Sequence, residues 1–134
     1  MEAVQKPRKK RIRQTRQVRF RAMGLAHAEL RNLRVSHRKL QLLADLTRGR
    51  DVQDAIEAAR YSNRKFATEV VKLIRSAVNN AEQKASVNPD KLYVKRVFVE
   101  QGPTLKRFMA RARGSGARIL KRISHMVVVV DERN

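Results

Sequence analysis

Residues 102–125 read GPTLKRFMARARGSGARILKRISH, and this stretch is the most informative part of the sequence. It contains no Asp or Glu, it begins with a Gly-Pro pair, and Gly114 and Gly116 lie near its middle. Strand-like runs flank it, LYVKRVFVE from Leu92 and SHMVVVVD ending at Asp131. Its cations are Lys106, Arg107, Arg111, Arg113, Arg118, Lys121 and Arg122.

Two strands joined by a long basic connection indicate a protruding β-hairpin over residues 101–125, because a structureless loop of this length is unusual inside a compact domain. With roughly 12 residues in each half at about 3.3 Å per residue, this arm would reach about 40 Å. The radius of gyration of a domain of this size is only about 13 Å. We therefore expect the arm to project, with Arg113, Gly114 and Ser115 at its tip. Nucleic-acid phosphates, unlike the chain itself, can neutralise the cations there.

The composition indicates a polyanionic partner. The 134 residues include 32 Lys and Arg against 12 Asp and Glu, a formal net charge of +20. Self-repulsion at this charge disfavours a compact isolated state. The absence of cysteine excludes disulfides and thiolate metal sites. No apolar run approaches the roughly 18 residues of a transmembrane helix, so we expect no membrane partner.

The N-terminal region differs in composition from the rest. We divide the chain into a basic extension, residues 1–22, and a single α+β domain, residues 23–134. The extension buries too little apolar surface to order itself, so we expect it to be disordered alone and extended on an anionic partner. It lacks an apolar signal core, which argues against secretion. An organelle transit peptide is an alternative, but the segment is poor in Ser and shows no amphipathic period.

Three helices are predicted after a first strand at Ala26–Val35. Ser36 is placed to cap a helix running to about Arg48, which Gly49 would end in a left-handed conformation. Asp51 is placed to cap a second helix. A third and longest helix is predicted from Asn63 to about Ser86.

Two further strands complete the prediction. In the run from Leu92 to Glu100, simple alternation places Tyr93, Val97 and Val99 on one face and Leu92, Val94 and Phe98 on the other. The apolar run Met126–Val130 suits a strand that is central in a small sheet or buried on both faces. The order of elements predicts an α+β fold, a small three-stranded antiparallel sheet packed by three helices.

No catalytic constellation emerges from the sequence. His27, His37 and His125 are far apart and have no clustered acids, so we expect neither a metal site nor a cofactor. Asp51 and Asp54 suit the starts of helices, where the helix dipole favours negative charge. The glycines near Ser115 do not follow a phosphate-loop pattern. We therefore expect a protein without enzymatic activity.

Basic segments are the candidate functional sites, through phosphate neutralisation and, for arginine, forked contacts. Most of the few aromatic residues occur at core-like spacings, which argues against a stacking platform and favours recognition of folded RNA by shape. A DNA-compacting or transcription factor is the main alternative, but Asp51, Asp54 and Glu57 make the second helix too acidic to read DNA. A membrane-active peptide would need apolar residues opposite the charges, which the extension lacks.

Residues 102–130 together with LYVKRVFVEQ before them resemble the signature of large-subunit ribosomal protein twenty-two, a universal family, in its bacterial type. SHRKLQLLADLTRGR and SAVNNAEQKA extend the resemblance, which covers Ala26 to Asp131. Three positions depart from the family pattern. Ala110 and His37 stand where many members have proline, and Ser115-Gly116 replaces a stretch that usually carries an Arg and an Asp.

The resemblance implies a structural role in the large ribosomal subunit. It implies binding to large-subunit (23S-type) rRNA, support of subunit assembly, and a hairpin that lines the polypeptide exit tunnel. Its implied partners are large-subunit rRNA, neighbouring ribosomal proteins and the nascent polypeptide, in the cytoplasm rather than an organelle. The tip residues nearest the nascent chain would be Arg111, Arg113, Gly114 and Ser115. The arm cations would contact rRNA, and we extend this expectation to Arg8, Lys9, Lys10, Arg11, Arg13, Arg16, Arg38 and Lys39.

Overall fold

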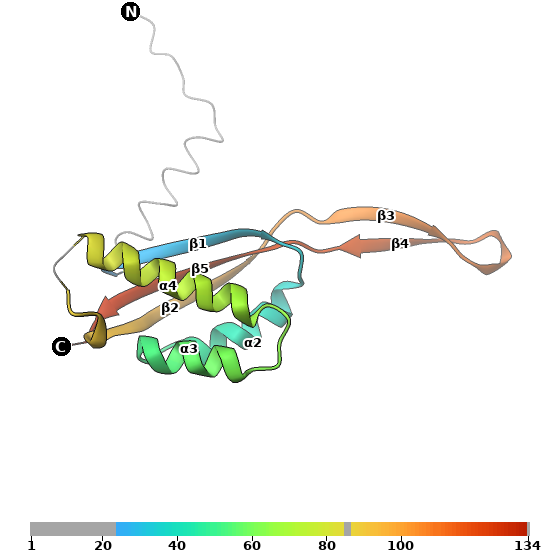
Figure 1. Cartoon of the computed structure of the whole chain (residues 1–134). Helices are drawn as coiled ribbons and strands as arrows, with labels where there is room; N and C mark the ends of the chain where they lie inside the picture. Colours follow the sequence, from blue (N-terminus) through green and yellow to red (C-terminus); the bar gives the residue numbers. More distant parts are fainter. Residues whose placement is uncertain (1–23, 85–86, 134) are drawn as a thin grey trace, which may run out of the picture.

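The computed structural model describes residues 24–84 and 87–133, and the predicted extension of residues 1–22 lies outside this range. Three helices lie on one face of a three-stranded antiparallel sheet, and a two-stranded arm extends from one end of the sheet (Figure 1). The predicted α+β class with a protruding hairpin is confirmed. The elements are β1 (Ala26–Leu33), α2 (His37–Thr47), α3 (Val52–Tyr61), α4 (Ala67–Lys84), the 3-10 turn η1 (Pro89–Lys91), β2 (Leu92–Gln101), β3 (Leu105–Ala110), the 3-10 turn η2 (Ala112–Gly114), β4 (Gly116–Lys121) and β5 (Ser124–Glu132).

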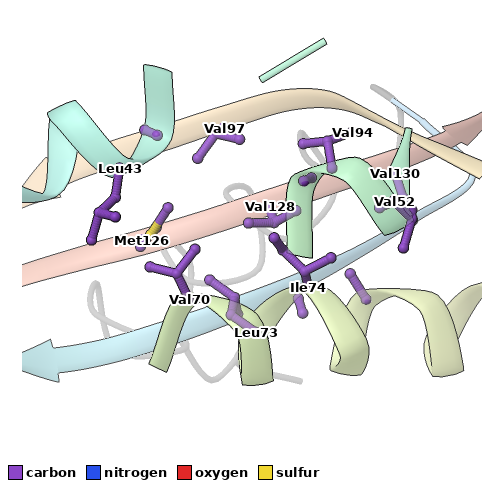
Figure 2. Close-up of a cluster of buried hydrophobic side chains, with 14 of the residues drawn as sticks. Leu43, Val52, Val70, Leu73, Ile74, Val94, Val97, Met126, Val128 and Val130 are labelled. Atoms are coloured by element: carbon purple, nitrogen blue, oxygen red, sulfur yellow. The ribbon is translucent and has the colours of Figure 1, made fainter. Parts of the chain in front are cut away.

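β5 is the central strand, as its β-branched run predicts, and the strand order is β1-β5-β2. Met126, Val128 and Val130 belong to the core between the sheet and the helices. Val127 and Val129 are also buried and form a separate cluster with Phe98. Residues of the main core from the helices and from β2 are shown in Figure 2 and include Leu43, Val52, Val70, Leu73, Ile74, Val94 and Val97.

The alternation predicted for β2 is wrong, because a β-bulge interrupts it. Val94 pairs with Val130 and Arg96 with Val129, so Lys95 is one extra residue in the strand. An extra residue reverses the parity of everything that follows it. Val97 therefore joins Val94 in the main core instead of facing away from it.

A similar irregularity explains the ambiguous pattern of β1. The register with β5 shifts between Leu30 and Leu33, and Asn32 adopts φ 62. Ala28, Leu30 and Leu33 all pack toward the core, so the spacing between inward residues changes from two positions to three at the shift. β1 ends at Leu33 rather than at the predicted Val35.

The helix starts differ from the predicted capping. Ser36 and Asp51 occupy the N-cap positions of α2 and α3, but neither side chain makes a capping hydrogen bond. The Asp51 carboxylate instead accepts a hydrogen bond from Arg133 at 2.8 Å. Gly49 adopts the predicted left-handed conformation (φ 77), and its N–H donates to the Val94 carbonyl at 2.8 Å.

The third helix begins later than predicted, at Ala67 instead of Asn63. The Arg64 N–H donates to the Ser62 carbonyl (2.7 Å) and the Ala67 N–H to the Arg64 carbonyl (3.0 Å). These short-range bonds form turns that compete with a helical ladder. The last residue that the structure describes in this helix is Lys84, and the predicted end at Ser86 lies outside the described residues.

Candidate nucleic-acid interface

The arm is a two-stranded ribbon whose strands pair only with each other. β3 pairs with β4 from Leu105↔Lys121 to Ala110↔Gly116, separately from the three-stranded sheet. At its base the Gly102 N–H donates to the Ile123 carbonyl at 2.7 Å. Figure 1 shows that the ribbon leads away from the helices and from the C-terminal end of the sheet.

The tip is a tight turn with two left-handed residues. Arg113 has φ 59 and ψ 33, and Gly114 has φ 69. The Arg111 N–H donates to the Ser115 carbonyl at 2.8 Å, and the Ser115 hydroxyl donates to the Ala112 carbonyl at 2.9 Å. The turn therefore places Arg113, Gly114 and Ser115 at the far end of the arm, where the sequence predicts them.

The arm cations lie on both sides of the ribbon. Directly paired residues share a side, and successive residues alternate. The register therefore places Arg107 and Lys121 on one side and Lys106 and Arg118 on the other. All seven arm cations are exposed. The ion pairs found among residues 24–84 and 87–133 all lie in the body, so none of them neutralises an arm cation.

A groove of about 1010 Å³ lies where the arm meets the body. Leu42, Phe66 and Leu120 supply apolar lining, and no acidic residue lines it. Its cations come from three separate parts of the body and from both strands of the arm, and they are Arg34, Lys39, Arg64, Lys65, Arg107, Lys121 and Arg122. An elongated anion is the ligand that this composition suits.

Two hydrogen bonds fix the arm base to the segment before α2. The buried Ser124 hydroxyl donates to the Val35 carbonyl at 2.7 Å. The Asn32 N–H donates to His125 Nδ1 at 3.0 Å. These bonds connect the arm base to the segment that carries Arg34 and Val35 of the groove lining.

Arg38 and Lys39 lie in the first turn of α2, where both side chains are exposed. Lys39 lines the groove, whereas Arg38 is outside its lining. Positive charge at a helix N-terminus opposes the helix dipole. An anion bound beside this turn would offset that repulsion.

Five acidic side chains, Glu29, Asp45, Asp51, Glu69 and Asp131, form ion pairs within the body. Lys95, the extra residue of the bulge, contacts Asp131 at 2.6 Å. The hydrogen bond that Lys95 donates to this carboxylate, followed by the charge of the carboxylate, raises the pKa of Lys95. In the same way, a hydrogen bond to Glu29 raises the pKa of Arg31. These acids therefore stabilise cations of the sheet and leave the arm and the groove positive.

The three histidines lie in separate places, His27 in β1, His37 at the start of α2 and His125 in β5. Within residues 24–84 and 87–133, no group of three or more His, Cys, Asp or Glu could hold a metal ion. In the same part of the chain, no helix is both long enough and apolar enough to cross a membrane.

The aromatic residues are less uniformly internal than their spacing indicates. Phe66 and Phe98 are half-buried, as expected for partners of the core. Phe108, in contrast, is 76% exposed in the middle of β3, and Tyr61 is 84% exposed at the end of α3. Phe108 is therefore available for stacking, contrary to the prediction from its spacing, because a two-stranded ribbon has no core in which to bury it.

Sequence reasoning missed three cations of the groove, Arg34, Arg64 and Lys65. Lys65 falls inside the helix predicted from Asn63, but it lies in the turn that precedes α4. The available signal was an acid-free run of cations beside a Ser-Asn pair, residues 62–65. The predicted contacts in the extension, from Arg8 to Arg16, lie outside the described residues.

An α+β body that carries an acid-free, two-sided cationic arm is the build of a structural ribosomal protein. The model of the family "Ribosomal protein L22p/L17e" matches residues 28–131, so the chain belongs to this family, and the predicted resemblance is confirmed. Members of the family are structural proteins and not enzymes, as predicted.

Curated relatives agree with the family assignment. The chain is 48% identical over 107 residues to "Large ribosomal subunit protein uL22" of Herpetosiphon aurantiacus, covering 80% of this chain and 95% of the relative. It is 47% identical over 108 residues to the protein of the same name from Syntrophotalea carbinolica, covering 81% and 98%. The protein of that name from Leptospira biflexa is 45% identical over 108 residues, covering 80% and 93%.

Proposed function

We propose that this chain, a structural constituent of the large ribosomal subunit, binds large-subunit (23S-type) rRNA through its arm and the groove at the arm base. In this role it supports subunit assembly. The observation that carries the proposal is the separation of charge, because the exposed arm cations have no acidic partner among the described residues. Each phosphate that these cations neutralise releases condensed counterions, which favours binding at low salt.

Cations on both sides of the ribbon support a particular mode of binding. An arm that lay on the surface of an RNA would need charge on one side only. Arg107 and Lys121 on one side, with Lys106 and Arg118 on the other, suit insertion between two RNA segments. Neighbouring ribosomal proteins would then contact the body, where the acidic residues lie.

The tip extends this proposal to the exit tunnel. Arg111, Arg113, Gly114 and Ser115 lie at the far end of the arm and would face the nascent polypeptide as part of the tunnel wall. Bacterial relatives support a cytoplasmic ribosome as its location. We also propose that residues 1–22 form a separate basic extension to the domain of residues 23–134, and that Arg8, Lys9, Lys10, Arg11, Arg13 and Arg16 add rRNA contacts.

The test replaces Lys106–Arg122 by a short turn in the full chain. We expect the variant to fold, because the arm residues are exposed and contribute little to the core. We expect loss of large-subunit assembly, of rRNA protection near the tunnel, and of the response to tunnel-binding macrolides.

Two variants complete the design. Arg60→Gln together with Arg75→Gln removes two body cations that line a different depression, between α3 and α4, and serves as the matched control. Stepwise Arg→Gln changes in the arm should reduce the salt slope of rRNA binding by about 0.7–0.9 per lost phosphate contact. Normal assembly and an unchanged footprint in the arm-deletion variant would contradict the proposal.

A further inference from the structure

Phe108 is the most exposed large apolar side chain of the arm. It is 76% exposed, against 46% for Met109 and 46% for Leu120. It lies in β3 directly opposite Arg118 of β4, on the same side of the ribbon as Lys106. The ring therefore lies beside two cations, with Leu120 on the same side of the ribbon, and it contributes nothing to the core of the body.

The ring packs against the opposite strand. A Cβ atom added at Gly116 would lie 2.2 Å from Cε2 and 2.3 Å from Cζ of Phe108. The ring thus lies directly against the Gly116 backbone, which only a residue without a side chain permits in this arrangement. With its inner side held by the strand, the ring has its remaining surface open to the surroundings.

The chemistry of the surroundings selects the class of partner. An aromatic ring in a groove or ribbon of cations is the combination with which proteins hold single-stranded nucleic acid, since the ring stacks on a base and the cations neutralise the flanking phosphates. Unpaired bases in RNA loops and bulges are available for such stacking, whereas bases inside a duplex are not. A protein partner would have to bring acidic side chains to this side of the ribbon, because Lys106 and Arg118 flank the ring.

We propose that Phe108, seated on Gly116 and flanked by Lys106 and Arg118, stacks on one unpaired rRNA base. This inference rests on the proposed rRNA binding by the arm and adds a base contact to its phosphate contacts. Phosphates repeat at every nucleotide of the RNA, so phosphate contacts alone allow several positions of the arm. A contact to one unpaired base would select a single position.

The first experiment identifies what touches the ring. Large subunits that contain the full chain are irradiated at 254 nm, digested with nucleases and protease, and analysed by mass spectrometry. We expect a nucleotide remnant on Phe108, and we expect it to disappear in Phe108→Leu, which keeps an apolar side chain. Gly116→Val keeps the ring but displaces it, so the yield should fall. A crosslink from Phe108 to protein, or an unchanged yield in Gly116→Val, would overturn the proposal.

The second experiment measures affinity of the full chain for large-subunit rRNA. We expect Phe108→Leu to weaken binding about tenfold and Phe108→Trp to restore it, because stacking depends on the aromatic face. The salt slope should stay unchanged, since no cation is lost. Met109→Ala, on the other side of the ribbon, is the control and should bind normally.

The two proposals fail in different ways. Normal binding by Phe108→Leu, while the arm-deletion variant fails to bind, would overturn the stacking contact and leave the proposed rRNA binding intact. Normal binding by the arm-deletion variant itself would overturn both. Thermal unfolding of each variant checks that the body is unchanged.

Discussion

Arg113 holds a backbone conformation that a glycine would adopt more easily. Its φ of 59 lies in the left-handed region, next to Gly114 with φ 69. The left-handed conformation costs a non-glycine residue roughly 1–2 kcal/mol. Strained residues of this kind persist at functional sites, where the side chain serves a purpose outside the local fold. A cation at the end of the arm would serve such a purpose under the proposed binding to rRNA.

Arg113→Gly should therefore stabilise the free tip by about 1 kcal/mol and weaken rRNA binding. Hydrogen exchange of the Arg111 amide, which donates to the Ser115 carbonyl, measures the first effect and should become slower. Arg113→Gln is the control, because it removes the charge and keeps the strain. Faster exchange in Arg113→Gly would contradict this account of the tip.

Individual side chains were the least predictable level of the structure. Ser36 and Asp51 are correctly placed at helix starts, but their capping bonds are absent. For Asp51 the reason is a competing partner, Arg133, which lies 82 residues away in sequence. A local pattern cannot reveal a partner that only the folded chain brings close.

Among the elements, a strand can be predicted at the right place while its side chains are assigned to the wrong face of the sheet. The run Met126–Val130 was interpreted correctly because every residue in it is apolar, so the parity of the strand does not matter. In β2 the parity is decisive, and Lys95 changes it. When Lys95 is left out, residues 92–94 and 96–99 alternate regularly between the core face and the opposite face of the sheet. Simple alternation along the whole run does not reveal this bulge.

Deletion of Lys95 should consequently be tolerated. The pairs Val94↔Val130 and Arg96↔Val129 would become consecutive, and Val97 would stay in the core. The expected loss is the ion pair with Asp131 together with the local twist of the strand. Deletion of Phe98 instead would turn Arg96 toward the core, and we expect the chain not to fold. Circular dichroism and thermal unfolding distinguish the two outcomes.

A severe loss of stability on deleting Lys95, similar to that of the Phe98 deletion, would contradict the interpretation of Lys95 as an insertion. Lys95→Ala, which keeps the bulge and removes the ion pair, is the control that separates the two contributions.

The arm and the groove differ in how far the sequence could predict them. The arm is one continuous run without acids, so both its existence and its cations were predictable. The groove is assembled from the segment after β1, the start of α2, the turn before α4 and the arm base. No spacing in the sequence indicates that Arg34 and Arg64 share a surface, because their proximity depends on how the helices pack on the sheet.

For the molecule as a whole, the net charge of +20 affects folding and binding in opposite directions. Salt screens the repulsion between cations and should stabilise the free chain. The same salt weakens the attraction to phosphates. Raising salt from about 0.05 to about 0.5 M should therefore increase the unfolding temperature of the free chain and decrease its affinity for rRNA.

Calorimetry or circular dichroism of the free chain, beside a binding titration at each salt concentration, tests this pair of opposite effects. Replacing the arm cations by Gln should reduce the salt dependence of rRNA affinity more than the salt dependence of the unfolding temperature, since the arm projects from the body (Figure 1). An unfolding temperature that falls with salt would contradict the role given to self-repulsion.

Most arm residues are exposed and none belongs to the buried core, so damage to the arm should leave the body folded. Proteases and chaperones detect exposed, unfolded polypeptide, so they would treat a chain with a defective arm as sound. Under the proposed function, the defect would escape detection in the free protein and would appear only later, as a particle that is built incompletely or passes its product poorly.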